Sequence, residues 1–244
     1  MPKFAVILPA AGKSSRFRDP NYKKPFAPLD NRAVWLHAAE RFVNRQDVEQ
    51  VILAVAPEDQ QLVQERFGAN LMILGIDLVL GGKTRAESVR NALARLRDTV
   101  DYVAVHDAVR PCLAVDWIDQ VFSAAVRSGA AILAVPVAAT LKRVTADRRI
   151  AETVSRESLW EAQTPQVFRR SLLEEAFRKA PDLSATDEAQ LVERLGHPVS
   201  VVTGSSLNLK ITTKEDLKLA SLVLRVLPQP RPAGPIHPFD EQWR

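Results

Sequence analysis

The sequence is poor in cysteine, lacks long apolar runs and has no basic run interleaved with aromatic residues. Its single cysteine, Cys112, allows no intrachain disulfide, which suits a reducing compartment, and we expect it to pack rather than to act as a nucleophile. The longest apolar segment, 130–139, contains Pro136 and is too short to span a bilayer. The strand-like run from Phe4 leaves no room for a signal peptide. These absences predict a cytoplasmic protein that binds neither membrane nor nucleic acid.

The rest of the composition is ordinary for one large globular domain. Hydrophobic residues make up 46% of the 244 residues and charged residues 25%, which is enough apolar material for a sizeable core. Lys and Arg number 33 against 29 Asp and Glu, so the net charge is +4. This mild excess favours small anionic molecules and is too diffuse to indicate nucleic acid.

Short β-prone runs alternate with amphipathic helical stretches through the first half of the chain. Strands are expected over 4–8, 50–56, 77–80, 102–106 and 131–135, and helices over 33–43, 58–67, 85–97 and 117–128. The alternation predicts an α/β fold with a mostly parallel sheet covered by helices on both faces. Ligands of such sheets bind beyond the carboxyl ends of the strands.

The pattern changes after residue 135. Residues 140–144 and 150–154 are β-prone and flank a polar turn, which predicts a protruding hairpin. Because an isolated two-stranded ribbon is marginal in water, we expect it to pack on something, with a second subunit as the candidate. Further helices are expected over 171–179, 187–195 and 214–227, and a strand over 199–203. Five of the 16 prolines lie in 228–244, so we divide the chain into a domain, 1–227, with an arm at about 138–156, and an extended tail.

The loop after the first strand, Pro9-Ala10-Ala11-Gly12-Lys13-Ser14-Ser15-Arg16, is followed by Lys23-Lys24-Pro25. Small side chains allow backbone N–H groups to approach phosphates, and the cations can neutralise the remaining charge. An ordinary turn with capping serines fits the loop alone equally well, and the lysine pair favours phosphate. The loop has one glycine, so it matches neither a Walker loop nor a dinucleotide fingerprint.

Two further stretches follow predicted strands. Gly81-Gly82 could open space for a flat base, and Ser88 could form a hydrogen bond to the edge of that base. Thr84 and Glu87 also fit a helix-capping box, and the two interpretations are compatible. Asp107 directly follows the predicted strand 102–106, at the edge where ligands bind, and a carboxylate that faces phosphates there is suited to hold Mg²⁺. Arg110 could bind another phosphate of the same ligand. The alternative is a capping Asp beside a packed His. A hydrolase is disfavoured because no Gly-x-Ser-x-Gly elbow is present.

Together these stretches resemble the 2-C-methyl-D-erythritol 4-phosphate cytidylyltransferases over residues 4–227. The loop at 9–16 indicates only the sugar-phosphate nucleotidyltransferase superfamily. The more specific motifs are Val105–Pro111, Thr140–Arg143, Thr153–Arg156, Leu159–Gln166 and Thr186–Glu188. The resemblance implies a Rossmann-like nucleotidyltransferase fold, a homodimer interlocked through the hairpin arm, and the transfer of a cytidylyl group from CTP with release of pyrophosphate.

The resemblance also implies roles for individual residues. The catalytic group would be Arg16, Lys24 and Lys210. The nucleotide would lie against Pro9, Ala10, Ala11, Gly12, Gly82, Ser88 and Asp107, with Asp107 also holding Mg²⁺. The polyol phosphate would meet Arg110, Thr140, Arg156, Thr164 and Thr186, with Thr140 and Arg156 from the second subunit.

The chain departs from the family pattern at a few positions. Ser14 replaces a usual glycine, Lys83 stands where relatives are often acidic, and one extra residue lies between Arg16 and the lysines. Lys24 keeps the family spacing to Phe26, so it is favoured over Lys23. Two alternative functions remain at this point: a ribitol-5-phosphate cytidylyltransferase, and a non-catalytic nucleotide-binding protein of the same fold.

Overall fold

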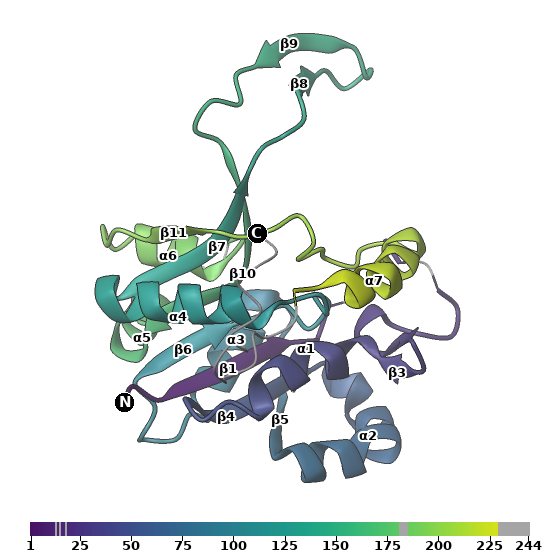
Figure 1. Cartoon of the computed structure of the whole chain (residues 1–244), viewed down its shortest axis with the longest axis vertical. Helices are drawn as coiled ribbons and strands as arrows, with labels where there is room; N and C mark the ends of the chain where they lie inside the picture. The colour runs from purple at the N-terminus through teal and green to yellow at the C-terminus, as the bar shows by residue number, and fades with distance from the viewer. Residues whose placement is uncertain (13, 15, 18, 181–184, 229–244) are drawn as a thin grey trace, which may run out of the picture.

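The computed structural model describes residues 1–12, 14, 16–17, 19–180 and 185–228 (Figure 1). The predicted tail, apart from Pro228, lies outside the described residues. The main sheet consists of β1 (Phe4–Pro9), β4 (Val48–Val55), β5 (Ile76–Leu80), β6 (Tyr102–Val105), β7 (Ala130–Pro136), β10 (Trp160–Arg169) and β11 (Ser200–Thr203). Its strand order is β11-β7-β10-β6-β1-β4-β5. Within the described part of the chain, no helix is long and apolar enough to cross a membrane.

The sheet is parallel except at β10. β1 pairs in parallel with β4 and β6, β4 with β5, and β7 with β11, whereas β10 runs antiparallel to both β6 and β7. This confirms the predicted mostly parallel α/β sheet. The carboxyl ends of β1, β5 and β6 therefore lie at one edge, where the loops that carry the candidate site residues begin.

Helices cover both faces of the sheet (Figure 1). One core layer contains α1 (Val34–Val43), α2 (Gln60–Leu74) and α4 (Val115–Ser128), and the other contains α3 (Arg85–Leu93), α5 (Arg170–Lys179) and α6 (Glu188–Glu193). β1 shows why both faces are apolar: Phe4, Val6 and Leu8 pack in the first layer, and Ala5 and Ile7 in the second. In a third, smaller hydrophobic cluster, α7 (Lys214–Val226) packs against the segment around Leu29.

The predicted hairpin is present and stands away from the sheet (Figure 1). It is formed by β8 (Leu141–Val144) and β9 (Ile150–Val154), which pair with each other in an antiparallel sheet of their own. Its tip exposes Val144 and Ile150 at 57% and 64% of their surface. Exposed β-branched side chains on an isolated ribbon are typical of a surface that packs against another chain.

The central strand β10 was not predicted from the sequence. Its segment contains Pro165, which lacks a ladder donor and argues against a central strand. The structure accommodates the proline at a register shift between Ala162 and Gln166, so the ladder to β7 continues on both sides of it.

Smaller differences concern the ends of elements. The helix expected over 85–97 ends at Leu93, because Arg95 and Leu96 bond three residues back in a tighter turn and the Arg97 amide donates to Gln50. The helix expected to end at 67 continues to Leu74, where Gly75 takes the left-handed conformation that ends many helices.

The remaining short elements lie close to the loops of the sheet edge. They are β2 (Pro28–Leu29), β3 (Arg32–Ala33) and single helical turns at Lys24–Phe26 and Pro57–Asp59. β2 and β3 form a small hairpin that was not expected, joined through Asp30 and Asn31 at positive φ. Asp and Asn tolerate this conformation better than most side chains do.

Leu133 lies fully buried in β7 between β10 and β11 and tests the packing of the sheet. Leu133→Ala is expected to lower the free energy of unfolding by about 2–5 kcal/mol, because it leaves a cavity in a close-packed layer. The matched control is Met72→Ala, whose side chain is exposed at 83%, with an expected change within about 0.5 kcal/mol. Urea unfolding at one protein concentration measures both, and equal effects would contradict this description of the core.

Candidate active site

A cavity of about 200 Å³ lies at the carboxyl ends of the strands. Its lining comes from the loop after β1, the turn at 24–25, the start of α3, the loop after β6 and Lys210. The lining residues are Pro9, Ala10, Ala11, Gly12, Ser14, Lys24, Pro25, Lys83, Thr84, Arg85, Ser88, Asp107, Val109 and Lys210. Eight of the predicted site residues are therefore brought together here: Pro9, Ala10, Ala11, Gly12, Lys24, Ser88, Asp107 and Lys210.

Asp107 is the buried carboxylate of this cavity. Its Oδ2 lies 2.7 Å from Nζ of Lys210 and 3.6 Å from Nε of Arg110, and its Oδ1 accepts a hydrogen bond from Nε of Arg85 at 3.2 Å. Burial opposes ionisation, but Arg85, Lys210 and Arg110 together hold the pKa of Asp107 well below its usual range. The carboxylate is therefore charged, and it holds three cations at the edge of the sheet.

Arg85 is held from its other side by Glu188. Both oxygens of this carboxylate accept from Nη1 of Arg85, at 2.5 and 2.6 Å, and Glu188 is only 1% exposed. Burial alone would lower the pKa of Arg85, but Glu188 and Asp107 raise it. The ion pair joins the start of α3 to the start of α6, so that the guanidinium remains fixed next to Asp107.

The structure separates the two neighbouring lysines. Nζ of Lys23 pairs with Asp59 at 2.8 Å and with Glu58 at 3.2 Å, and Lys23 does not line the cavity. Lys24 lines it, and its pKa is lowered by burial and by the nearby cations Lys210 and Arg16. A half-buried ammonium among like charges is a preformed site for an anion, so Lys24 is the better candidate.

Ser14 explains part of the loop geometry. Its φ is +52°, a conformation that favours glycine, and its Oγ accepts a hydrogen bond from the amide of Lys24 at 3.1 Å. The hydroxyl thus ties the loop after β1 to the turn that presents the lysine.

The other end of the cavity is built around Ser88. Its hydroxyl donates to the carbonyl of Thr84 at 2.9 Å and accepts from the amide of Gly82 at 3.1 Å. A Cβ on Gly81 would lie 2.6 Å from that hydroxyl, so the close approach requires glycine there. Thr84 caps α3 by accepting from the amide of Glu87, whereas the Glu87 carboxylate accepts from the amide of Lys83, so only half of the predicted capping box forms.

Other predicted residues lie at the margin of the cavity or away from it. Arg110 is 9% exposed, and its Nη1 donates to the carbonyl of Asn208 at 2.6 Å, while Thr164 contacts the amide of Asp107. Thr186 is exposed just before α6, where Asp187 caps the helix. Thr140 and Arg156 are exposed at the ends of the hairpin arm, and neither lines the cavity of its own chain.

Sequence reasoning assigned no site role to Arg85, Glu188, Asn208 or His106. Asn208 is fully buried. Its side-chain amide donates to the carbonyl of Thr164 at 2.8 Å, and its main-chain carbonyl accepts from Arg110. The available signal was their position within motifs already singled out or beside Lys210. What could not be seen is that Arg85 and Glu188, 103 residues apart, form an ion pair.

The donor set of the cavity suits a metal shared with a ligand. Among the described residues, no group of three or more His, Cys, Asp or Glu side chains could hold a metal ion alone. Asp107 offers one carboxylate beside cations and small loop residues. Mg²⁺ is commonly held by one or two carboxylates together with substrate phosphates and water, so Asp107 fits such an ion only as part of a nucleotide complex.

Comparison with known proteins agrees with this geometry. The family model described as "IspD: 2-C-methyl-D-erythritol 4-phosphate cytidylyltransferase" matches residues 4–226. The chain is 45% identical over 231 residues to the 2-C-methyl-D-erythritol 4-phosphate cytidylyltransferase of Rhodopirellula baltica, covering 90% of this chain and 94% of the relative. It is 42% identical over 234 residues to that of Solibacter usitatus, covering 91% and 96%.

Solved structures with these names have the same fold. The 2-C-methyl-D-erythritol 4-phosphate cytidylyltransferase of Thermus thermophilus superposes with a TM-score of 0.75 at 34% identity, covering 92% of this chain and 100% of that one. The enzyme of Francisella tularensis gives 0.76 at 32% identity, with coverages of 91% and 100%. With the sheet, the cation-lined cavity and the family model in agreement, the chain belongs to the 2-C-methyl-D-erythritol 4-phosphate cytidylyltransferase family.

Proposed function

We infer that this protein transfers a cytidylyl group from CTP to 2-C-methyl-D-erythritol 4-phosphate and releases pyrophosphate, a step of isoprenoid precursor synthesis. The observation that carries this inference is the cavity that Lys24 and Lys210 line together with the loop after β1 and Asp107 from the loop after β6. Small loop residues, cations and one carboxylate are what a nucleoside triphosphate with a metal ion requires. Membership of the family supplies the two substrates.

The chemistry is mainly electrostatic. The phosphate of the polyol is already an anionic nucleophile, so the barrier comes from bringing two anions together and from charge that grows on the α-phosphate and on the departing pyrophosphate. Lys24 and Lys210 line the cavity, and Arg16 is exposed outside its lining but close enough for its charge to lower the pKa of Lys24. We propose that the three cations stabilise that charge, which preorganised cations do without reorganisation during the reaction. Holding both phosphates in line supplies much of the remaining acceleration.

The nucleotide would lie along the cavity. The phosphates would lie against Pro9–Gly12, where Pro9 has no N–H and that of Ala10 donates to the carbonyl of Ala54, so the amides of Ala11 and Gly12 are the candidate donors. The cytosine would lie against Gly82 and Ser88. The hydroxyl proton of Ser88 already points to the carbonyl of Thr84, so its oxygen can offer the base only an acceptor. An acceptor fits the exocyclic amine of cytosine and repels the carbonyl of uracil.

The polyol phosphate would lie beyond Asp107, near Arg110, Thr164 and Thr186. We propose that Thr140 and Arg156 complete this end from a second subunit, because the arm carries them away from the cavity of their own chain. The exposed Val144 and Ile150 support a homodimer interlocked through the arm. Such a dimer would bury the two side chains symmetrically.

Members of the family generally use a divalent metal, and we propose Mg²⁺ held by Asp107 and the triphosphate. When bound, the ion would neutralise phosphate charge and polarise the α-phosphate. The part played by this chain is to keep the Asp107 carboxylate ionised and to hold it at the end of β6 through Arg85. We also propose that the catalytic domain spans 1–227 with the arm at 138–156, and that the protein works in the cytoplasm.

The direct test is pyrophosphate release with CTP, Mg²⁺ and 2-C-methyl-D-erythritol 4-phosphate, run beside the same assay with ribitol 5-phosphate. Turnover with the first polyol at least about tenfold more efficient is expected. Preference for ribitol 5-phosphate would reassign the substrate. CTP binding without turnover on either polyol would indicate a non-catalytic nucleotide-binding protein.

Lys24 and Lys23 form a matched pair for mutation. Lys24→Ala and Arg16→Ala are each expected to lower kcat by about 10²-fold or more, because each removes a preorganised charge near the α-phosphate. Lys23→Ala removes ion pairs with Asp59 and Glu58 that lie outside the cavity and should change kcat by less than about fivefold. Steady-state kinetics with both substrates measures the effects. A Lys24→Ala enzyme with near-normal kcat would remove this residue from the mechanism.

Removing the metal should abolish turnover. EDTA is expected to stop pyrophosphate release, and Mg²⁺ in excess to restore it. Asp107→Asn is expected to lower kcat/KM by about 10²-fold or more, since the amide cannot balance the cations around it. Asp98→Asn, an exposed carboxylate away from the cavity, is the control. Full activity in EDTA, or equal kinetics for the two variants, would count against this metal site.

The proposed sharing of sites between subunits can be tested by complementation. Lys24→Ala and Arg156→Ala should each be nearly inactive alone. After mixing under exchanging conditions, roughly a quarter of the wild-type activity is expected to return, because half of the dimers are mixed and each has one intact site. A mixture as inactive as its components would mean that Arg156 serves its own chain or that no such dimer forms. Sedimentation of the wild type checks the dimer independently.

A further inference from the structure

A buried chain of hydrogen bonds lies directly behind Asp107. His106 is 0% exposed, and its ring is in edge contact with Phe42 at 5.3 Å between centroids. Its Nδ1 lies 3.0 Å from Oγ1 of Thr164, and its Nε2 lies 3.0 Å from the carbonyl oxygen of Arg110. The same Oγ1 accepts a hydrogen bond from the amide of Asp107 at 3.0 Å. The chain therefore begins and ends on the loop that presents Asp107.

The partners determine where the protons lie. The carbonyl of Arg110 can only accept, so Nε2 of His106 must carry a hydrogen. Thr164 is 5% exposed and its Oγ1 accepts from the amide of Asp107, and among the described residues the acceptor within reach of its hydroxyl hydrogen is Nδ1 of His106. Nδ1 is then an acceptor, and its partner at 3.0 Å, the hydroxyl of Thr164, must be the donor.

We propose that His106 is a positioning residue whose neutral, Nε2-protonated ring takes the hydroxyl proton of Thr164, so that Thr164 supports the main chain at Asp107 and can meet substrate only as an acceptor. The inference rests on the function proposed above and deepens it. Phosphate oxygens are acceptors, so the hydroxyl of Thr164 does not bind the phosphate of either substrate. Its remaining lone pair can accept from a hydroxyl of the polyol.

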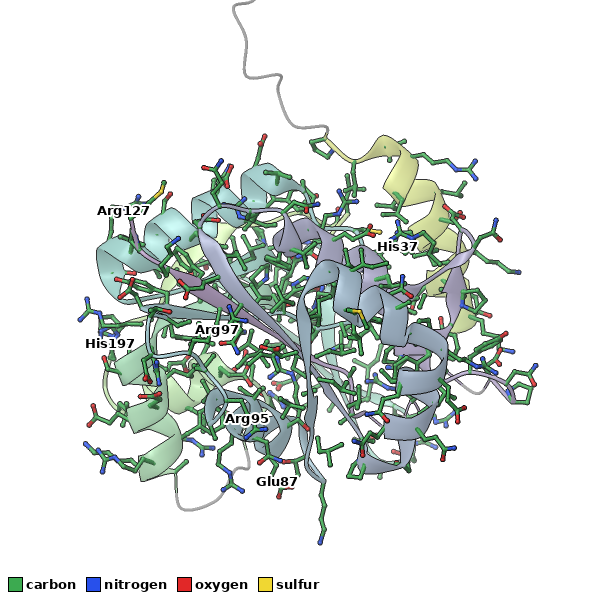
Figure 2. The ribbon with its side chains drawn as sticks, turned by 90° about the horizontal axis from the view of Figure 1, so that it is seen from below. His37, Glu87, Arg95, Arg97, Arg127 and His197 are labelled. Atoms are coloured by element: carbon green, nitrogen blue, oxygen red, sulfur yellow. The ribbon has the colours of Figure 1, made fainter. Side chains whose placement is uncertain are left out.

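The neighbouring contacts explain why this matters for the reaction. His106 holds the carbonyl of Arg110, and Asn208 holds its guanidinium at 2.6 Å and the carbonyl of Thr164 at 2.8 Å. Asp107 is bonded to both Thr164 and Arg110, because its amide donates to Oγ1 of Thr164 and its carbonyl accepts from the amide of Arg110. The other two histidines that the structure describes do not belong to this hydrogen-bond chain. The ring of His37 contacts the carbonyl of Leu29, and that of His197 the carbonyl of Pro198. Both lie away from Glu87, which marks the start of α3 beside the cavity (Figure 2).

The tautomer can be read directly from ¹H–¹⁵N long-range correlation spectra of the imidazole nitrogens. The full-length wild type, with His106 assigned by comparison with a His106→Gln sample, is expected to show a neutral ring with the proton on Nε2 at pH 7. A ring protonated on Nδ1, or on both nitrogens, would overturn the proposal. This spectrum needs no substrate, so it remains informative if the enzyme proves to act on another polyol phosphate.

Two variants of the histidine separate its two bonds. The side-chain oxygen of Asn can occupy the position of Nδ1 and accept from Thr164, whereas the amide of Gln reaches the position of Nε2. His106→Gln is expected to lower kcat by about tenfold, the scale of one lost buried hydrogen bond, while KM for CTP changes by less than about threefold. His106→Asn should recover most of that loss. If Asn is no better than Gln, the contact to Thr164 is not what matters.

A double-mutant cycle distinguishes positioning from direct contact. Thr164→Val keeps the shape and removes the hydroxyl, and it is expected to lower kcat by about tenfold. The double variant Thr164→Val with His106→Gln should be no worse than either single variant, because both break the same chain. Effects that multiply to about a hundredfold would show that Thr164 acts on substrate independently of His106 and would overturn the proposal. Thermal unfolding midpoints of all variants show whether each is folded.

Discussion

The site depends on one buried carboxylate. Asp107 lies at the end of a fully buried strand, where an unpaired charge would cost several kcal/mol. It is stabilised there by Lys210 at 2.7 Å, Arg85 at 3.2 Å and Arg110 at 3.6 Å, and Glu188 balances Arg85 from behind. Three cations thus meet two carboxylates. Lys210 and Arg85 line the cavity, so the ion pairs that stabilise the buried Asp107 also place positive charge where a triphosphate would bind.

The second constraint is the antiparallel strand β10. Inserted between β6 and β7, it brings Thr164 next to the amide of Asp107, and its register shift falls at that point. At its other end it pairs with β7, and both strands lead into the arm (Figure 1). One strand therefore connects the support of Asp107 with the hairpin proposed to reach a second subunit, which links the geometry of catalysis to assembly.

Local sequence was sufficient for the parts of the fold that follow local rules. The apolar runs of β1, β4 and β6 and the amphipathic helices gave the parallel sheet, and polar residues after those strands gave the cavity. It was insufficient for β10, because Pro165 hides a central strand, and for the Arg85–Glu188 pair, because that contact joins residues 103 positions apart. Lys24 could be preferred by spacing, but only the ion pair of Lys23 with Asp59 shows which lysine is engaged elsewhere.

The central claim is that the cations gathered by Asp107 form the triphosphate site. The most direct measurement is a crystal structure of the protein with CTP and Mg²⁺. In that complex, Nζ of Lys210, now 2.7 Å from Oδ2 of Asp107, is expected to contact a phosphate oxygen, and Asp107 is expected to approach the metal ion. A triphosphate bound away from Lys24 and Lys210, with the Lys210–Asp107 pair unchanged and no metal near Asp107, would contradict it.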